Sequence, residues 1–260
     1  ARPETDTGNT YMNMGLYDLA IKDYTKGTEV HPKPFLNYYN RGNLYRDMAQ
    51  FDLAEADYKK TIELAPKYYS AYINYGGMLK QLNRDEDAID VYTQAINEHP
   101  KKHLAYAARA LVLNKLNLRE NALDDMSLAI EKHPRSSNSY FMRGTLYAEY
   151  GERELALADY KKALSINPKD TGVLNNLYML LRDLKRYDEQ FEVINRSLSI
   201  NNKNPVAFFD RAVLKEERGD LEGAIYDYGM AIRFNPQYFA AYNNRGNLHS
   251  RMGDKGKAES

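Results

Sequence analysis

Apolar residues recur three and four positions apart in successive short segments of this chain. In one such segment Ala54, Tyr58, Thr61 and Ile62 follow this spacing. Side chains three and four residues apart share one face of an α-helix, so each segment predicts an amphipathic helix with one buried face. We therefore expect an all-α chain.

The same pattern returns every 34 residues. Proline marks the period most clearly, at Pro32, Pro66, Pro100, Pro134, Pro168 and Pro236, with Asn202 in the vacant slot. A second column holds small residues: Gly8, Gly42, Gly76, Ala110, Gly144, Ala212 and Gly246. A third is alanine: Ala20, Ala54, Ala88, Ala122, Ala156, Ala224 and Ala258. Small residues at fixed points allow two helices to approach closely, while proline cannot continue the second helix.

Large aromatic residues fill complementary columns. One contains Tyr38, Tyr72, Tyr106, Tyr140, Phe208 and Tyr242, and another contains Tyr24, Tyr58, Tyr92, Tyr160 and Tyr228. The first helix of each unit should end at Gly15, Gly151, Gly219, Gly253, Asn83 and Asn117. Glycine and asparagine tolerate the left-handed conformation that closes a helix C-terminus.

These small, alanine, aromatic and proline columns resemble the tetratricopeptide repeat along almost the whole chain. The resemblance implies a right-handed superhelical α-solenoid whose first helices line a concave inner face. We expect one solenoid domain over residues 1–260, with units 1–34, 35–68, 69–102, 103–136, 137–170, 171–204 and 205–238 and a partial unit 239–260. Unit 171–204 is irregular, because Tyr178 replaces the small residue and Gln190 the alanine. We expect altered curvature there.

Charged residues covary inside the units. Four units pair an arginine with an aspartate: Arg41 with Asp57, Arg109 with Asp125, Arg143 with Asp159, and Arg211 with Asp227. Two other units have Tyr75 with Val91 and Leu177 with Val193 at these positions. Unit 1–34 departs from the rule, with Thr7 and Asp23. Removing one member of a poorly solvated ion pair is costly, whereas replacing both by apolar groups can be nearly neutral. We therefore predict an Arg–Asp bridge between the two helices of each charged unit.

Polar residues that packing does not require gather on the first helices. Asparagines before and after the small column resemble the asparagine ladder of the tetratricopeptide region of O-linked N-acetylglucosamine transferases, which grips an extended peptide. A carboxamide both donates and accepts hydrogen bonds, as a peptide unit does. Adding nearby aromatic and cationic residues, the predicted peptide-binding residues are Tyr39, Asn40, Asn43, Arg46, Asn74, Lys80, Phe141, Asn176, Phe209, Asn243, Asn244 and Asn247.

Composition narrows the classes of partner. Thirty-six basic residues balance thirty-six acidic ones, so no overall charge attracts nucleic acid. There is no cysteine, and three of the five histidines directly precede a repeat proline. No phosphate-binding loop, zinc-type histidine spacing or serine-nucleophile motif is present, and acidic pairs such as Glu216–Glu217 fit a solvated surface. We expect no enzyme activity, no cofactor and no metal site.

The predicted partner is another protein or peptide, bound as an extended or helical segment by a non-catalytic scaffold. Two alternatives remain open: a homo-oligomeric assembly scaffold, and the recognition arm of a larger membrane protein or enzyme. No apolar run is long enough for membrane insertion. The compartment stays open, with the cytoplasm preferred over the periplasm or membrane attachment through a longer chain. Both ends resemble cut points, which suggests a fragment of a longer protein.

Overall fold

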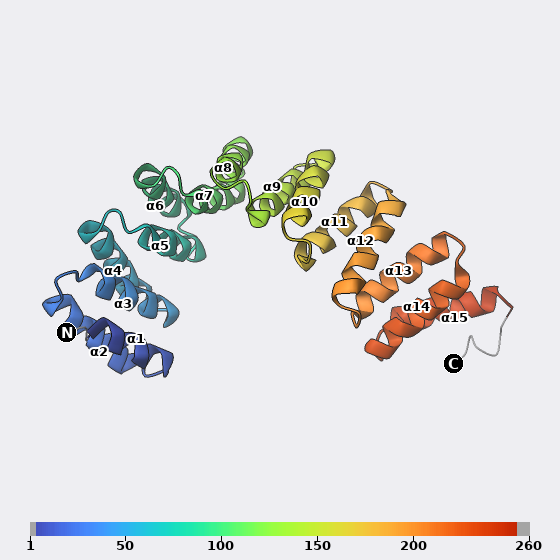
Figure 1. Cartoon of the computed structure of the whole chain (residues 1–260), viewed down its shortest axis with the longest axis horizontal. Coiled ribbons are helices and arrows are strands. Elements are labelled where there is room, and N and C mark those ends of the chain that lie inside the picture. The colour runs from blue at the N-terminus through green and yellow to red at the C-terminus, as the bar shows by residue number, and fades with distance from the viewer. Residues whose placement is uncertain (1–3, 254–260) are drawn as a thin grey trace. The chain divides into compact units, whose positions relative to one another are not determined.

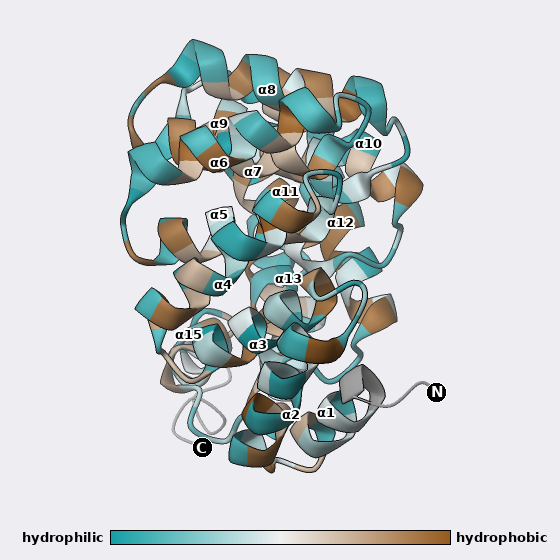
Figure 2. Cartoon of the chain, turned by 90° about the vertical axis from the view of Figure 1, so that its left-hand side faces the viewer, coloured by the Kyte–Doolittle hydropathy of each residue, from teal (hydrophilic) through white to brown (hydrophobic). Residues whose placement is uncertain are grey.

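The structure, a computed structural model, describes residues 4–253. Over this range the chain forms fifteen α-helices and no β-strand (Figure 1). The helices are α1 (Glu4–Asn13), α2 (Tyr17–Val30), α3 (Phe35–Asp47), α4 (Phe51–Leu64), α5 (Tyr69–Gln81), α6 (Asp85–Glu98), α7 (His103–Lys115), α8 (Arg119–Lys132), α9 (Ser137–Glu149), α10 (Arg153–Ile166), α11 (Thr171–Asp183), α12 (Tyr187–Ile200), α13 (Pro205–Glu217), α14 (Leu221–Phe234) and α15 (Phe239–Arg251). Figure 2 shows hydrophobic and hydrophilic residues mixed along the helices, as amphipathic helices require.

The chain divides into two compact units, residues 1–135 and 136–260. Odd-numbered helices are the first helices of the repeats, and even-numbered helices are the second. Inside each unit a first helix packs on its second helix, which packs on the first helix of the next repeat. Each unit is therefore an α-solenoid of helix-turn-helix repeats, which confirms the predicted fold class. Whatever part of the last predicted repeat follows residue 253 lies outside the described residues.

The turns inside the repeats share one backbone feature. Left-handed φ angles occur every 34 residues, including the predicted positions Gly15, Asn83, Asn117, Gly151, Gly219 and Gly253. Ala49 and Lys185 also adopt this conformation, with φ of 58° and 57°. Their side chains gave no signal of it, because the Cβ atom disfavours left-handed backbone. The repeat geometry imposes the turn even there.

The small column and the tyrosine column fit together. Tyr24, Tyr58 and Tyr228 are completely buried. A Cβ atom added to Gly76 would lie 2.5 Å from the ring of Tyr92, and one added to Gly144 would lie 2.9 Å from the ring of Tyr160. Glycine is thus needed where a second-helix tyrosine lies directly against the first helix.

The predicted Arg–Asp bridges are present in all four charged repeats. Each guanidinium donates two hydrogen bonds to the carboxylate, with N···O distances of 2.7–2.9 Å. The aspartates are buried, while the arginine side chains are 14–21% exposed. Hydrogen bonding to Asp57 raises the pKa of Arg41, and bonding to Asp125 raises the pKa of Arg109 in the same way. The covariation of arginine and aspartate in the sequence therefore corresponds to an ion pair that is largely shielded from water.

The arginines also connect one repeat to the preceding one. Arg41 donates to Thr25 Oγ1 at 2.8 Å, Arg109 to Thr93 Oγ1 at 2.8 Å, and Arg211 to Asn195 Oδ1 at 2.9 Å. Each acceptor belongs to the second helix of the repeat before. The guanidinium thus joins three helices, a contact that the sequence analysis did not foresee.

The irregular repeat packs differently from its neighbours. Tyr178 is half-buried and packs, as Phe191 and Phe209 do, against the buried core of the C-terminal unit. Gln190 is 1% exposed, and its Oε1 atom has no hydrogen-bond partner in the described part of the chain. The curvature expected there stays a prediction.

Candidate functional site

All twelve predicted binding residues lie on first helices. Six belong to the unit before residue 136 and six to the unit after it. The first group is Tyr39, Asn40, Asn43 and Arg46 on α3 with Asn74 and Lys80 on α5. The second is Phe141 on α9, Asn176 on α11, Phe209 on α13 and Asn243, Asn244 and Asn247 on α15. Each unit therefore carries its own candidate surface.

Asparagine and tyrosine side chains in the N-terminal unit form hydrogen bonds between repeats. Tyr58 donates to Asn43 Oδ1 at 2.7 Å, and Asn74 donates to the same oxygen at 2.8 Å. Asn74 also donates to the Tyr39 hydroxyl at 2.9 Å. The amide hydrogens of Asn74 are thus already used inside the protein, whereas its Oδ1 accepts no hydrogen bond among residues 4–253.

The same arrangement occurs one repeat earlier. Tyr24 donates to Asn9 Oδ1 at 2.6 Å, and Asn40 donates to that oxygen at 3.3 Å. Burial raises the pKa of Tyr24 to about 12, so its hydroxyl remains a donor at neutral pH. Asn9 was not among the predicted site residues, although its 34-residue register with Asn43 was a usable signal. In this unit the asparagines contribute to the joints between repeats as well as to the surface.

The three predicted aromatic residues all pack against tyrosines of neighbouring segments. Tyr39 meets Tyr68 edge-on at a centroid distance of 5.0 Å, and Phe141 lies 5.9 Å from Tyr160. Phe209 lies 5.5 Å from Tyr228. Each is half-buried, which leaves part of the ring at the surface. A binding role for these rings stays a prediction beside their packing role.

A polar pocket in the C-terminal unit contains two of the predicted asparagines. It encloses about 450 Å³ and is lined by Asn244, Asn247, Glu216, Ser250 and Arg251. Asn244 donates to the Tyr228 hydroxyl at 3.1 Å, which donates to Glu216 Oε2 at 3.1 Å. Asn247 is exposed and has no hydrogen-bond partner within residues 4–253. The pocket therefore offers unused amide donors and acceptors beside a Glu–Arg pair.

Sequence reasoning did not assign Glu216, Ser250 or Arg251 to a site. Glu216 was expected to solvate the outer surface, and this expectation is wrong, because the carboxylate is half-buried and forms an ion pair with Arg251 at 2.5 Å. Glu216 precedes the helix C-terminus by one residue, where nothing in the local sequence distinguishes it from its neighbour Glu217. Only the packing of α15 beside α13 brings the partner close.

Asp210 occupies the same position in its repeat as Asn176 and Asn244 do in theirs. Burial raises its pKa to about 6, and the charge of Arg182 opposes that shift only partly. Burial raises the pKa values of Tyr178 and Tyr238, and the negative charge of Asp210 adds to both shifts. The C-terminal unit therefore contains a carboxyl group that changes charge near neutral pH.

The remaining predicted residues show simple surface environments. Arg46 is half-buried and bonds to Asp47 at 2.7 Å, while Lys80 is half-buried without a partner in residues 4–253. Asn176 and Asn243 likewise make no hydrogen bond there. Over the same range, no group of three or more His, Cys, Asp or Glu residues is arranged to hold a metal ion. No helix there is both long and apolar enough to cross a membrane.

Comparison with solved structures places this arrangement among known helical repeats. YrrB, described as a TPR protein with an unusual peptide-binding site, is 22% identical with a TM-score of 0.57, over 75% of this chain and 97% of that chain. A tetratricopeptide repeat protein from Parabacteroides merdae is 22% identical with a TM-score of 0.58, over 86% and 89%. A MamA structure is 25% identical with a TM-score of 0.56, over 64% and 96%. No curated protein compared with the chain gives a match.

Family models match the chain directly. Models of the tetratricopeptide repeat match residues 7–34, 37–68, 69–101 and 137–170, and one described as TPR repeat matches residues 217–253. These segments together cover more than half of the sequence and coincide with helix pairs of both units. The chain therefore belongs to the tetratricopeptide repeat family.

Proposed function

We propose that this chain is a non-catalytic scaffold that binds a segment of another polypeptide on the first-helix faces of its repeats. The observation that carries the proposal is the polar pocket at Asn244 and Asn247, whose lining offers hydrogen-bonding groups that the protein itself does not use. The peptide-binding site named for YrrB supports the same class of ligand.

The chemistry of the pocket suits a peptide backbone. A backbone amide needs one acceptor and one donor, and a single carboxamide side chain supplies both. The Glu216–Arg251 pair adds charged groups of both signs, which can meet polar side chains of the ligand. Recognition through carboxamides alone would depend little on the ligand's sequence, whereas the ion pair and the half-buried rings would add selectivity.

Affinity capture from extracts of the source cells tests the proposal. The variant is Asn176→Ala with Asn247→Ala, because neither side chain makes a hydrogen bond within residues 4–253. Alanine favours helix more than asparagine, so the fold should be kept. The matched control is Asn97→Ala with Asn121→Ala, two exposed asparagines on the second helices α6 and α8.

Loss of a captured polypeptide in the first variant, with retention in the control, is the expected result. Equal capture by both variants would contradict binding on the first-helix face. Capture of this chain alone would favour the assembly-scaffold alternative, and a concentration-dependent mass in analytical ultracentrifugation would then establish it.

A further inference from the structure

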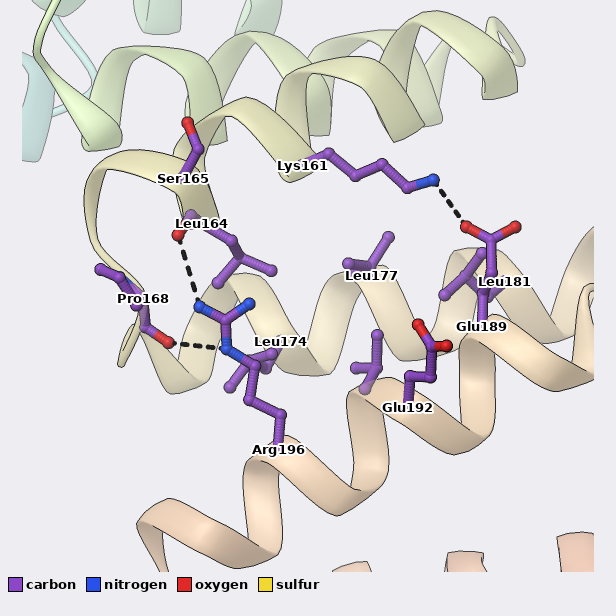
Figure 3. Close-up of a pocket in the computed structure, with 11 residues that line it drawn as sticks. Lys161, Leu164, Ser165, Pro168, Leu174, Leu177, Leu181, Glu189, Glu192 and Arg196 are labelled. Carbon is purple, nitrogen blue, oxygen red and sulfur yellow. Dashed lines mark hydrogen bonds and ion pairs between the residues drawn. The ribbon is translucent and has the colours of Figure 1, made fainter.

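Two pockets on the second-helix side of the repeats occupy the same position in two different repeats. The larger encloses about 580 Å³ among α10, α11 and α12, and the smaller about 270 Å³ among α4, α5 and α6. Leu177 and Lys161 line the larger pocket (Figure 3). Val193 lines it as well. Their equivalents three repeats earlier, Tyr75, Val91 and Lys59, line the smaller.

Both pockets occur where the Arg–Asp pair is replaced by apolar residues. In the charged repeats the guanidinium lies between its aspartate and the preceding second helix, as Arg109 does between Asp125 and Thr93. Leu177 and Val193 have no such groups, so the corresponding space is open. The pocket is therefore a consequence of the same covariation that identifies the bridges.

A third column changes together with the pair. Where the complete Arg–Asp pair is present, the preceding repeat supplies an acceptor such as Thr25, Thr93 or Asn195. Where it is absent, the same position holds Lys59 or Lys161. A lysine there would repel an arginine, so its appearance in both pocket repeats completes a distinct, repeated set of side chains.

The larger pocket has an apolar floor and a charged rim. Leu174, Leu177 and Leu181 of α11 form the floor in Figure 3, between Lys161 of α10 and Glu189 of α12. At the rim, Lys161 Nζ and Glu189 Oε2 form an ion pair at 2.6 Å. Its volume lies within the range of about 300–1,000 Å³ typical of ligand pockets. Such a floor accepts an apolar side chain.

One carboxylate at the rim of the larger pocket, that of Glu192, makes no hydrogen bond or ion pair among residues 4–253. Arg196 donates to the backbone oxygens of Pro168 at 3.0 Å and Leu164 at 3.4 Å. Asp90, the equivalent of Glu192 at the smaller pocket, makes no such bond or pair over this range either, whereas Arg196 is replaced there by Gln94. The unpaired charge that the two pockets share is negative.

We propose that the pocket at Leu177 and Val193 is a second docking site, which takes an apolar side chain of a partner polypeptide that carries a lysine or arginine next to it. The apolar side chain enters between α10 and α12 and covers the leucines of α11. The adjacent cation pairs with Glu192. This site faces the second helices and is separate from the first-helix surface of the proposed function.

Methyl-resolved NMR of the whole chain with capped tetrapeptides tests the site. The probe is acetyl-Gly-Leu-Lys-Gly-amide, and the controls replace its lysine by glutamate or its leucine by alanine. The Leu–Lys peptide should shift the methyl signals of Leu174, Leu177 and Val193, with a dissociation constant on the order of 1 mM, because so small a ligand has few contacts. Both control peptides should bind more weakly.

Two protein variants assign the contacts. Glu192→Gln should weaken binding of the Leu–Lys peptide about two- to fivefold, as an exposed ion pair allows. Leu177→Arg with Val193→Asp and Lys161→Thr rebuilds the arrangement of Arg109, Asp125 and Thr93, and should abolish binding by filling the pocket. The Asn176→Ala, Asn247→Ala variant should bind the peptide normally, which separates this site from the first-helix surface.

Three results would overturn the proposal. The first is the absence of shifts at the pocket methyl groups at 10 mM peptide, on the order of ten times the expected dissociation constant. The second is equal binding of the lysine and glutamate peptides. The third is unchanged binding by the refilled variant. Because the peptide comparison uses the unaltered protein, the test holds even if a variant does not fold.

Discussion

Replacing both members of the Arg109–Asp125 pair should cost far less stability than the two single replacements together. The carboxylate is 5% exposed and the arginine side chain 21%, so neither charge is well solvated alone. Arg109→Leu leaves a buried carboxylate and should lower the free energy of unfolding by about 3 kcal/mol. Asp125→Val leaves a cation that can still reach water, so we expect about 2 kcal/mol.

The double replacement copies what Leu177 and Val193 already do in another repeat. It removes both charges, and Thr93 Oγ1 loses the hydrogen bond from Arg109 but still donates to the Ile89 carbonyl, so we expect a loss of about 2 kcal/mol or less. Simple addition of the single losses would give about 5 kcal/mol, so the cycle should show a coupling energy of about 3 kcal/mol.

Urea unfolding of the four proteins measures this cycle. Helix loss is followed by circular dichroism, and side-chain environment by tyrosine fluorescence, since the chain has 23 tyrosines and no tryptophan. Coincident transitions are required, because repeat arrays can unfold in stages. Lys60→Ala, which breaks the exposed pair with Glu63, serves as the control and should leave the urea midpoint almost unchanged. Losses that add within about 0.5 kcal/mol would refute the reasoning.

Two further predictions concern the turn and the buried carboxyl. Lys185→Gly should raise the free energy of unfolding by about 0.5–1 kcal/mol, and the urea midpoint with it, because glycine adopts the φ of 57° without the Cβ penalty. A lower midpoint would show that the backbone at Lys185 is not strained. Asp210 has a folded-state pKa of about 6, above its ordinary 3.8. Between these two pH values the folded protein binds a proton that the unfolded chain has released. The stability that this proton contributes is therefore lost as pH rises from about 4 to 6. Asp210→Asn should remove that pH dependence and stabilise the protein at pH 7 by about 1 kcal/mol, allowing for solvent screening of a partly exposed group. Parallel stability–pH curves for the two proteins, measured by thermal melting from pH 4 to 8, would show that Asp210 does not carry this effect.

The periodic columns were sufficient for the fold because a repeat protein uses local and next-neighbour contacts almost exclusively. Gly76 and Tyr92 lie sixteen residues apart in one repeat, and their contact recurs wherever the columns recur. The Arg–Asp bridges were predictable for the same reason, since a buried charge and its partner must appear and disappear together. The glycine–tyrosine contact and the Arg–Asp bridge each recur in several repeats, so one chain shows each pattern several times.

The candidate surfaces were less accessible to sequence reasoning. The asparagine column identified Asn244 and Asn247, but Glu216 and Arg251 meet only because α13 and α15 lie side by side. Asn40 and Asn74 were predicted from their polarity, which did not distinguish hydrogen bonds between repeats from hydrogen bonds to a ligand. Side-chain polarity alone does not tell which partner a carboxamide uses.

By itself, the sequence determined the helices, their 34-residue period, most of the turns and the paired charges, because these depend on residues at fixed short separations. Tertiary structure decided the left-handed turns at Ala49 and Lys185, where packing of the repeat overrides local preference. It also decided that the absent Arg–Asp pair opens a pocket, because an empty volume depends on the helices around it. The sequence pattern identifies which side chains each repeat contains, whereas the volume left between those side chains depends on how the neighbouring helices pack.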